Sequence, residues 1–416
     1  MRNEKVLVLG DDTRIFLSVA RSLGRAGKEV HAVPLNWHSP ALKSKYVQQV
    51  HYCPRYSDDP KAWCEAILKL HQVHSFALIL PCDDPWIIPL HSHRDSFVGL
   101  PIAIHDSAVM TPLFDKLSTR QMCGELGIPV APGGCLAAEH NAPDLITRFA
   151  LPLIIKSRRS YWIDRMDMMG KAMIVDSKEQ LEDVLASLQD RSRYLVEGFF
   201  DGSGVGVSVI AKDGKISQAF QHRRLREGRG GPSSYRISET LNPELYSACE
   251  RISARTRLTG VCMFEFRYNL ATRKWILIET NARLWGSLSL PVSLGVDFPR
   301  LLFDLVAHRQ SHPAVTYAHG VRSRNFVLDG YNLLTAIRDR KLSLASLAVE
   351  CGAFLTQPLR WMTGTERSDT FVLDDFSPAL WELATLGRSV GQKIVRSRST
   401  ALKRRRVEQR AFQRPA

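Results

Sequence analysis

The sequence predicts an α/β protein that begins with a parallel sheet flanked by helices. The prediction rests on three short apolar runs that are expected to be buried strands. They span residues 5–9, 29–33 and 76–81. Helical patterns lie between them, one ending at Gly27 and another covering 60–73. Strands that alternate with helices are typical of a parallel sheet. Later in the chain, apolar and polar residues alternate, which predicts antiparallel hairpins.

Length and composition describe a globular protein. The chain has 416 residues, of which 44% are hydrophobic and 24% charged, enough for two to four subdomains. It contains no apolar run of about 18 residues, so no membrane-spanning helix is predicted. The apolar run before Gly10 is too short for a signal peptide, and we expect a cytoplasmic protein. The eight cysteines form no C-x-x-C pair, which favours reduced thiols over a cysteine zinc site.

The net charge of +14 is concentrated near the C-terminus. Residues 388–416 contain ten Lys or Arg and one Glu, which places +9 in this tail and +5 in the rest of the chain. Neither a zinc-finger spacing nor an aromatic RNA-binding motif accompanies the charge, so we expect no specific nucleic-acid partner. The tail is expected to aid solubility, or to contact an anionic membrane or an acidic partner.

Acidic residues follow two of the predicted parallel strands. Asp11 and Asp12 follow the first strand, and Asp83 and Asp84 follow the third. Open α/β sheets bind ligands at the carboxyl ends of their strands, so these residues line a cleft or, alternatively, cap the following helices. The first turn reads GDDTRI rather than G-x-G-x-x-G, which argues against a dinucleotide-dependent oxidoreductase.

The stretch 261–283 predicts a metal site on a β-hairpin. Glu265 lies in its first strand, and Glu279, Asn281 and Arg283 follow at steps of two in and after the second. Residues two apart share one face of a strand, and pairing brings Glu265 opposite them. Two carboxylates and an amide oxygen suit Mg²⁺ that carries nucleotide phosphates. The alternative is an edge hairpin whose charges face water, which the apolar context disfavours.

Two lysines lie at the edges of predicted elements. Lys116 opens an amphipathic helix that Gly127 ends, and Lys156 occupies the last inward position of the apolar strand 151–157. A lone lysine at such a place is usually a surface residue with a buried stem. Two of them, about forty residues apart, suggest a pair directed at phosphate groups.

Two basic segments are predicted as loops. Residues 221–236 combine five arginines with three glycines, which predicts a flexible loop. The loop is either merely solvated, or it clamps a phosphate or carboxylate through Arg223 or Arg224. The second segment, 157–170, is also rich in arginine and aromatic residues. Between these segments, the strand 194–200 is apolar except for Glu197.

The order of these residues resembles the ATP-grasp superfamily. Its members carry a lysine on a helix, a lysine on a strand, a glutamate on the linking strand, and a glutamate followed by Glu-x-Asn-x-Arg. Lys116, Lys156, Glu197, Glu265 and the stretch from Glu279 match this order. The resemblance implies that Glu197 accepts a hydrogen bond from adenine and that 157–170 replaces a glycine-rich phosphate lid.

The resemblance also implies a domain organisation. We expect a parallel α/β domain that precedes the ATP-grasp fold, a small lid subdomain, a carboxyl subdomain that carries the metal site, and a helical C-terminal extension with the basic tail. The expected boundaries are 1–112, 113–195, 196–310 and 311–416.

The expected function is that of an ATP-dependent carboxylate–amine ligase. ATP would phosphorylate a small-molecule carboxylate, an amine would displace the phosphate, and ADP and phosphate would leave. One or two Mg²⁺ or Mn²⁺ ions, held by Glu265, Glu279 and Asn281, would bridge the phosphates, and Arg283 would contact the transferred group. The alternatives are a nucleotide-binding regulator or adaptor without turnover and, from charge alone, a nucleic-acid-binding protein. A homodimer is also expected.

Overall fold

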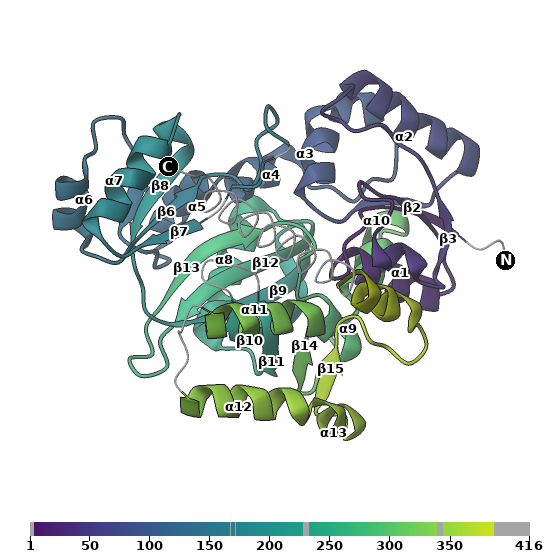
Figure 1. Cartoon of the computed structure of the whole chain (residues 1–416). Coiled ribbons are helices and arrows are strands. Elements are labelled where there is room, and N and C mark those ends of the chain that lie inside the picture. The colour runs from purple at the N-terminus through teal and green to yellow at the C-terminus, as the bar shows by residue number, and fades with distance from the viewer. Residues whose placement is uncertain (1–3, 167, 171, 228–232, 339–343, 387–416) are drawn as a thin grey trace, which may run out of the picture.

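The computed structural model describes residues 4–166, 168–170, 172–227, 233–338 and 344–386. Its strands form three sheets. The N-terminal sheet (purple) and the small sheet (teal) lie on opposite sides of the molecule, and the large sheet (green) lies between and below them (Figure 1). The basic tail 388–416, and with it the predicted contact with a membrane or an acidic partner, lies outside the described residues.

The N-terminal sheet is parallel, as predicted. Its strand order is β3-β2-β1-β4, with β1 (Lys5–Leu9), β2 (Glu29–Val33), β3 (Val47–Val50) and β4 (Leu78–Pro81). The connecting elements are α1 (Phe16–Arg25), η1 (Pro40–Lys43), α2 (Pro60–His74), α3 (Asp84–Ser92) and η2 (Arg94–Phe97). Alternate residues of β1 pack on opposite faces, Val6 and Val8 with α1, and Leu7 and Leu9 with α2 and α3.

The small sheet is antiparallel, with the order β5-β8-β6-β7. Its strands are β5 (Gly133–Cys135), β6 (Leu153–Ser157), β7 (Ala172–Val175) and β8 (Tyr194–Gly198). Two amphipathic helices cover one face, α6 (Ala142–Phe149) and α7 (Lys178–Ser187), and η3 (Arg191–Arg193) precedes β8. Two helices connect this unit to the N-terminal sheet, α4 (Ser107–Phe114) and α5 (Lys116–Glu125). The predicted strands 151–157 and 194–200 are therefore neighbours.

The large sheet has the order β13-β12-β9-β10-β11-β14-β15. Its strands are β9 (Ser203–Lys212), β10 (Lys215–Glu227), β11 (Ser233–Glu239), β12 (Gly260–Tyr268), β13 (Trp275–Asn281), β14 (Arg322–Arg324) and β15 (Glu366–Ser368). One face packs on α4, α5 and α8 (Pro243–Thr256). On the opposite face, the sheet and the N-terminal domain share an apolar core with α9 (Ser289–Ser293) and α10 (Phe298–Ala307).

Residues 221–236 are not mainly a loop, and this part of the prediction is wrong. β10 continues to Glu227 and β11 begins at Ser233, so most of the segment is a β-hairpin. The arginines on the described parts of these two strands therefore point to defined faces of the sheet. Residues 228–232 lie outside the described part of the chain.

The C-terminal region contributes strands as well as helices. It contains α11 (Phe326–Arg338), α12 (Leu344–Leu355) and α13 (Gln357–Met362), while β14 and β15 extend the large sheet. Buried ion pairs join these parts: Arg324 contacts Asp329 at 2.6 Å and Glu366 at 2.9 Å. The chain then returns to α1, where the buried Arg21 contacts Asp375 at 2.8 Å. Residues 322–338 and 344–375 are thus part of the packed structure. The domain boundaries remain predictions.

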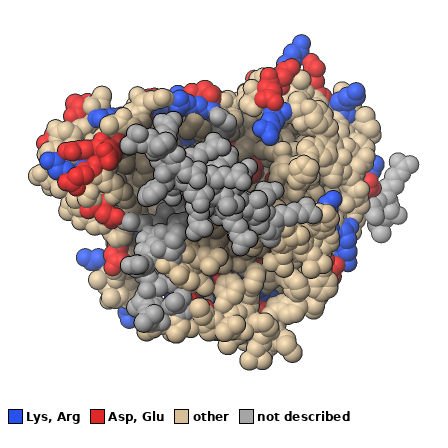
Figure 2. Space-filling view, in the orientation of Figure 1, with Lys and Arg blue, Asp and Glu red and all other residues tan. Residues whose placement is uncertain are grey.

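The described surface mixes both signs of charge. On the face in Figure 2, blue and red side chains lie together along the upper rim, and uncharged residues dominate the lower part. Six cysteines are buried, Cys135 is partly exposed, Cys351 is exposed, and all eight are free thiols. Among the described helices, none combines the length and apolar character that crossing a bilayer requires.

Candidate nucleotide and metal site

The three predicted metal ligands meet on one face of the large sheet. In the β12–β13 hairpin, Glu265 pairs directly with Glu279, and Met263 pairs with Asn281. A β-bulge follows, because Phe266 pairs with Leu277 and leaves Ile278 as an extra residue. The Asn281 amide Nδ2 lies 3.2 Å from Glu265 Oε1 and 3.4 Å from Glu279 Oε1. The predicted convergence is therefore present in the structure.

Cations surround Glu279. Lys116 Nζ lies 3.4 Å from Glu279 Oε2. Burial alone would raise the pKa of Glu279, but Lys116, Lys156, Arg224 and Arg283 outweigh it and lower this pKa to about 2. Glu279 is therefore ionised at neutral pH, as a metal ligand must be.

Lys156 joins the small sheet to the large sheet. Its Nζ lies 2.7 Å from Glu197 Oε2 and donates to the carbonyl of Ile278 at 3.0 Å. Ile278 is the bulged residue and has no partner in the pairing of β12 with β13, so its carbonyl can accept from the lysine. The other Glu197 oxygen accepts from Arg120 Nη1 at 2.8 Å, a partner that the sequence analysis missed. Glu197 holds the cations in place, and its contact with adenine remains a prediction.

Arg158 and Arg159, at the beginning of the second basic segment, contact the start of α5. Asp115 caps this helix by accepting from the backbone N–H groups of Leu117 and Ser118. The same carboxylate contacts Arg158 at 2.8 Å and Arg159 at 3.3 Å. These contacts hold Arg158 and Arg159 beside Lys116, at the start of the segment where the resemblance places a phosphate lid.

The structure separates Arg223 from Arg224. Neighbouring residues of a strand point to opposite faces, and here Arg224 contacts Glu265 while Arg223 contacts Glu239 at 2.5 Å on the face that carries α8. Of the two candidates, only Arg224 lies on the face with the candidate metal ligands. Gly206, between Glu265 and His222 in the sheet, leaves room for the imidazole, because a Cβ there would lie 2.4 Å from that ring.

A group of arginines that the sequence analysis missed lies next to Arg224. Arg236 is its direct partner on β11, and Arg14 reaches the same region from the N-terminal domain, donating to the carbonyl of Gly286 at 3.0 Å. Burial first, and then Arg236 and Arg224, lower the pKa of Arg14 to about 10. Within the described structure, Nε and Nη1 of the fully buried Arg236 have no hydrogen-bond partner. Because Nη2 of Arg236 already contacts Asp369 at 2.5 Å, it is these two nitrogens of Arg236 that predict an anionic ligand.

Arg283 links the hairpin to the N-terminal domain. Its Nε and Nη2 contact the carboxylate of Asp84 at 2.6 and 3.3 Å. The two residues line a pocket of about 170 Å³ that also contacts Lys116, Tyr161 and Asn281. The prediction that Asp84 lies in a cleft therefore agrees with the structure. In contrast, Asp12 caps the start of α1, and Asp11 accepts from the backbone of residues 35 and 36.

Asp83 is the acidic residue whose pKa is raised most clearly in this region. Burial first, and then the carboxylates of Asp12 and Asp84, raise its pKa to about 8. Its Oδ1 has no hydrogen-bond partner among the described residues. The folded protein therefore favours the protonated form at neutral pH.

Replacement of Asp83 by Asn is expected to stabilise the protein more as the pH rises. The unfolded carboxyl loses its proton near pH 3.9, whereas the folded one keeps it until about pH 8. The Asp83 contribution is thus fully present below pH 4 and is lost as the pH rises through 8. Denaturant unfolding at several pH values should show a difference in free energy that grows from pH 4 to 8 and then levels off. A difference that does not change with pH would contradict this assignment.

Comparison with solved structures identifies the fold. The L-amino acid ligase from Bacillus licheniformis superposes with a TM-score of 0.56 at 16% identity, covering 74% of this chain and 75% of that one. The N5-carboxyaminoimidazole synthetase from Staphylococcus aureus, complexed with ADP, gives 0.58 at 15% identity, covering 76% and 80%. The chain therefore has the ATP-grasp fold.

Sequence comparisons agree with this fold. Residues 190–326 match the family described as ATP-grasp in the biosynthetic pathway with Ter operon. A carbamoyl-phosphate synthase of Methanobrevibacter smithii is 20% identical over 293 residues, covering 68% of this chain and 75% of the relative. Residues 190–326 thus match an ATP-grasp family, and the chain is similar in structure to an L-amino acid ligase and an N5-carboxyaminoimidazole synthetase.

Proposed function

We propose that this protein is an ATP-dependent ligase that activates a carboxylate as an acyl phosphate and joins it to an amine. The observation that carries the proposal is the convergence of Glu265, Glu279 and Asn281 beside Lys116. A carboxylate oxygen attacks the γ-phosphorus, and the bond to ADP breaks. The amine nitrogen then attacks the acyl carbon, phosphate leaves with its oxygen, and the amine loses a proton.

The proposed metal ligands fit Mg²⁺. Two carboxylates and an amide provide hard oxygen donors, and the low pKa of Glu279 keeps its charge. Mg²⁺ bound with ATP would neutralise charge on the phosphate groups. The structure of the similar N5-carboxyaminoimidazole synthetase from Staphylococcus aureus contains ADP, which supports a nucleotide at this site.

The chain's own cations would position the phosphates. Lys116, at the start of α5, and Lys156, on β6 of the small sheet, both reach the β12–β13 hairpin. Phosphoryl transfer depends chiefly on positioning and charge stabilisation, so it needs no protein nucleophile. Glu197, held between Lys156 and Arg120, would also accept from the adenine amino group.

The carboxylate substrate would bind between the arginines and the pocket at Arg283. Arg14 lies near Arg224, which contacts Glu265. It also lies near Arg236, which contacts Asp369 and keeps two unpartnered nitrogens among the described residues. Arg283 and Asp84 form the wall shared with the N-terminal domain. We assign the substrate carboxylate and the acyl phosphate to this region.

Release of ADP tests the proposal. The full chain should be incubated with ATP–Mg²⁺ and pairs drawn from amino acids and small carboxylates, with ATP alone as the control. ADP formation that requires both a carboxylate and an amine supports a ligase. Binding of ATP–Mg²⁺ without ADP formation from any pair would favour a regulator that keeps the fold without turnover.

Arg224 and Arg223 provide a matched pair of variants. Replacement of Arg224 by Gln is expected to slow ADP formation by roughly tenfold, because it removes a charged hydrogen bond of about 1.5 kcal/mol from the site face. Replacement of Arg223 by Gln removes the same charge from the opposite face and should leave the rate close to that of the parent. Steady-state rates at saturating ATP–Mg²⁺ distinguish the two. Equal losses would place the carboxylate contact elsewhere.

A further inference from the structure

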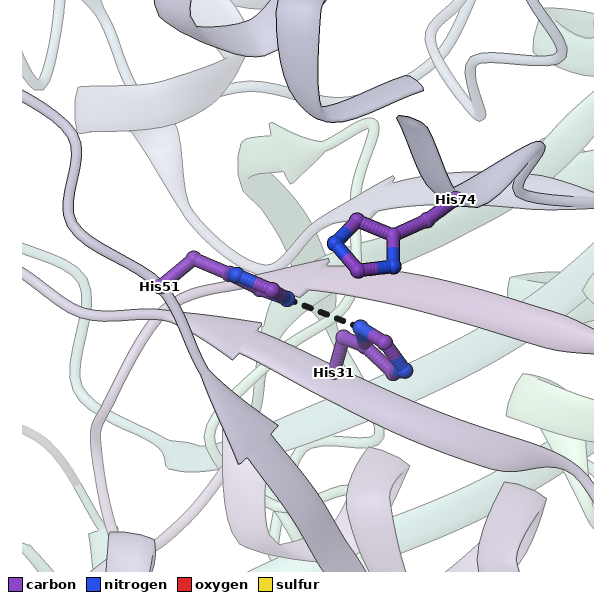
Figure 3. A group of neighbouring side chains, drawn as sticks. All are labelled: His31, His51 and His74. Carbon is purple, nitrogen blue, oxygen red and sulfur yellow. Dashed lines mark hydrogen bonds between the residues drawn. The ribbon is translucent and has the colours of Figure 1, made fainter. Parts of the chain in front are cut away.

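Three histidines from distant parts of the sequence meet in the N-terminal domain. His31 lies on β2, His51 directly follows β3, and His74 is the last residue of α2. Figure 3 shows the three rings directed toward one another. His31 and His51 are buried, and His74 is partly exposed. The cluster lies on the face of the N-terminal sheet that α2 covers, apart from the residues assigned to ATP.

The ring nitrogens are close enough to share one ion. One nitrogen from each ring can be chosen so that all three lie within 4.8 Å of one another. His31 Nδ1 and His51 Nε2 are hydrogen-bonded at 2.8 Å. Tetrahedral zinc with Zn–N bonds of about 2.0–2.1 Å requires nitrogens roughly 3.3 Å apart. Small rotations of the rings therefore suffice, and His74 provides access from solvent.

Glu29 supplies the outer contact that histidine ligands need. Its Oε1 lies 2.9 Å from His31 Nε2. A proton on Nε2, donated to this carboxylate, leaves Nδ1 as the lone-pair nitrogen that faces His51. Carboxylates commonly orient metal-binding imidazoles in this way. Phe76 packs edge-on against the His31 ring, with centroids 5.2 Å apart, and limits its movement.

We propose that His31, His51 and His74 bind one transition-metal ion, with Zn²⁺ preferred. Three imidazoles suit zinc far better than magnesium or calcium, which take oxygen ligands. Water would complete the four-coordinate shell. The bound ion would join the C-terminal end of α2 to β2 and to the edge strand β3. The site is separate from the proposed ligase site and does not depend on it.

Metal titration of the full chain tests this proposal. Any histidine tag is removed, the protein is stripped with a chelator, and Zn²⁺ is titrated in competition with a chromophoric chelator. Excess Mg²⁺ is present throughout, so that oxygen ligands remain occupied. One Zn²⁺ per chain is expected, and Co²⁺ should give the visible spectrum of a four-coordinate nitrogen site.

The variants separate ligands, outer contact and background binding. Replacement of His74 by Gln should abolish stoichiometric binding. His74 is partly exposed, so the fold should stay intact, which circular dichroism can verify. The Glu29→Gln variant should lose roughly 10- to 100-fold in zinc affinity, because Glu29 orients the ligand His31 and does not bind the ion itself. The exposed His38, replaced by Gln, serves as the control and should bind as the parent does. A parent without stoichiometric zinc, or a His74→Gln variant with unchanged affinity, would overturn the proposal.

Discussion

Replacement of Glu279 by Gln is expected to slow phosphoryl transfer by on the order of 10²–10³, through loss of roughly 3–4 kcal/mol of charge stabilisation. Glu279 pairs with Glu265 across the hairpin, contacts Lys116 and is held ionised by the surrounding cations. The amide keeps the size of the side chain but removes the charge that would bind Mg²⁺. ADP formation at saturating Mg²⁺, with the substrate pair from the screen, measures the loss.

The control for this variant is Glu250, which is exposed on α8 at the opposite face of the large sheet. Its replacement by Gln removes one negative charge from the protein without touching the hairpin. The Glu250→Gln rate should therefore equal that of the parent. A Glu279→Gln rate equal to the parent rate at saturating Mg²⁺ would contradict the proposal that Glu279 binds the metal ion.

Replacement of Lys116 by Met is expected to weaken ATP–Mg²⁺ binding by about 10- to 150-fold, or ~1.5–3 kcal/mol for a lost charged hydrogen bond. Met retains most of the apolar stem, and Lys116 is partly exposed at the start of α5, so stability should change little. Calorimetric titration gives the affinity, and thermal unfolding gives the stability. Parent-like affinity would show that Lys116 points elsewhere when nucleotide binds.

The Lys156→Met variant should lose affinity to a similar extent and also lose stability. Lys156 is buried against Glu197, whose second partner is Arg120. Removal of one member of a buried ion pair leaves excess charge in a poorly solvated place. The Lys156→Met variant should therefore unfold at a lower temperature than the Lys116→Met variant, whose side chain is partly exposed.

Strand alternation made the convergence of the three candidate metal ligands predictable. Steps of two place Glu279 and Asn281 on one face, and the polar turn between the two runs sets Glu265 opposite them, as the register shows. The bulge at Ile278 was not predicted, although three consecutive apolar residues, 276–278, interrupt the alternation and signal it. Its free carbonyl fixes Lys156, so the missed bulge matters for the site.

Long-range contacts account for most of what the sequence did not predict. Arg14 and Arg236 are separated by more than 200 residues and meet only because the N-terminal domain packs against the large sheet. β14 and β15 have three residues each, RSR and ERS, which show no apolar alternation. Buried ion pairs with Arg324 hold them, and such pairs depend on tertiary neighbours rather than on local sequence.

Transfer of oxygen-18 from the carboxylate to phosphate tests the central claim most directly. The carboxylate substrate from the ADP screen is labelled in both carboxyl oxygens and allowed to react with ATP–Mg²⁺ and the amine. Attack on the γ-phosphorus makes one carboxylate oxygen the bridge of the acyl phosphate. When the amine attacks the acyl carbon, the bond between that carbon and the bridging oxygen breaks, and the oxygen remains on phosphorus. Mass spectrometry should find one oxygen-18 in each phosphate released. Formation of the joined product with unlabelled phosphate would contradict activation of the carboxylate by this protein.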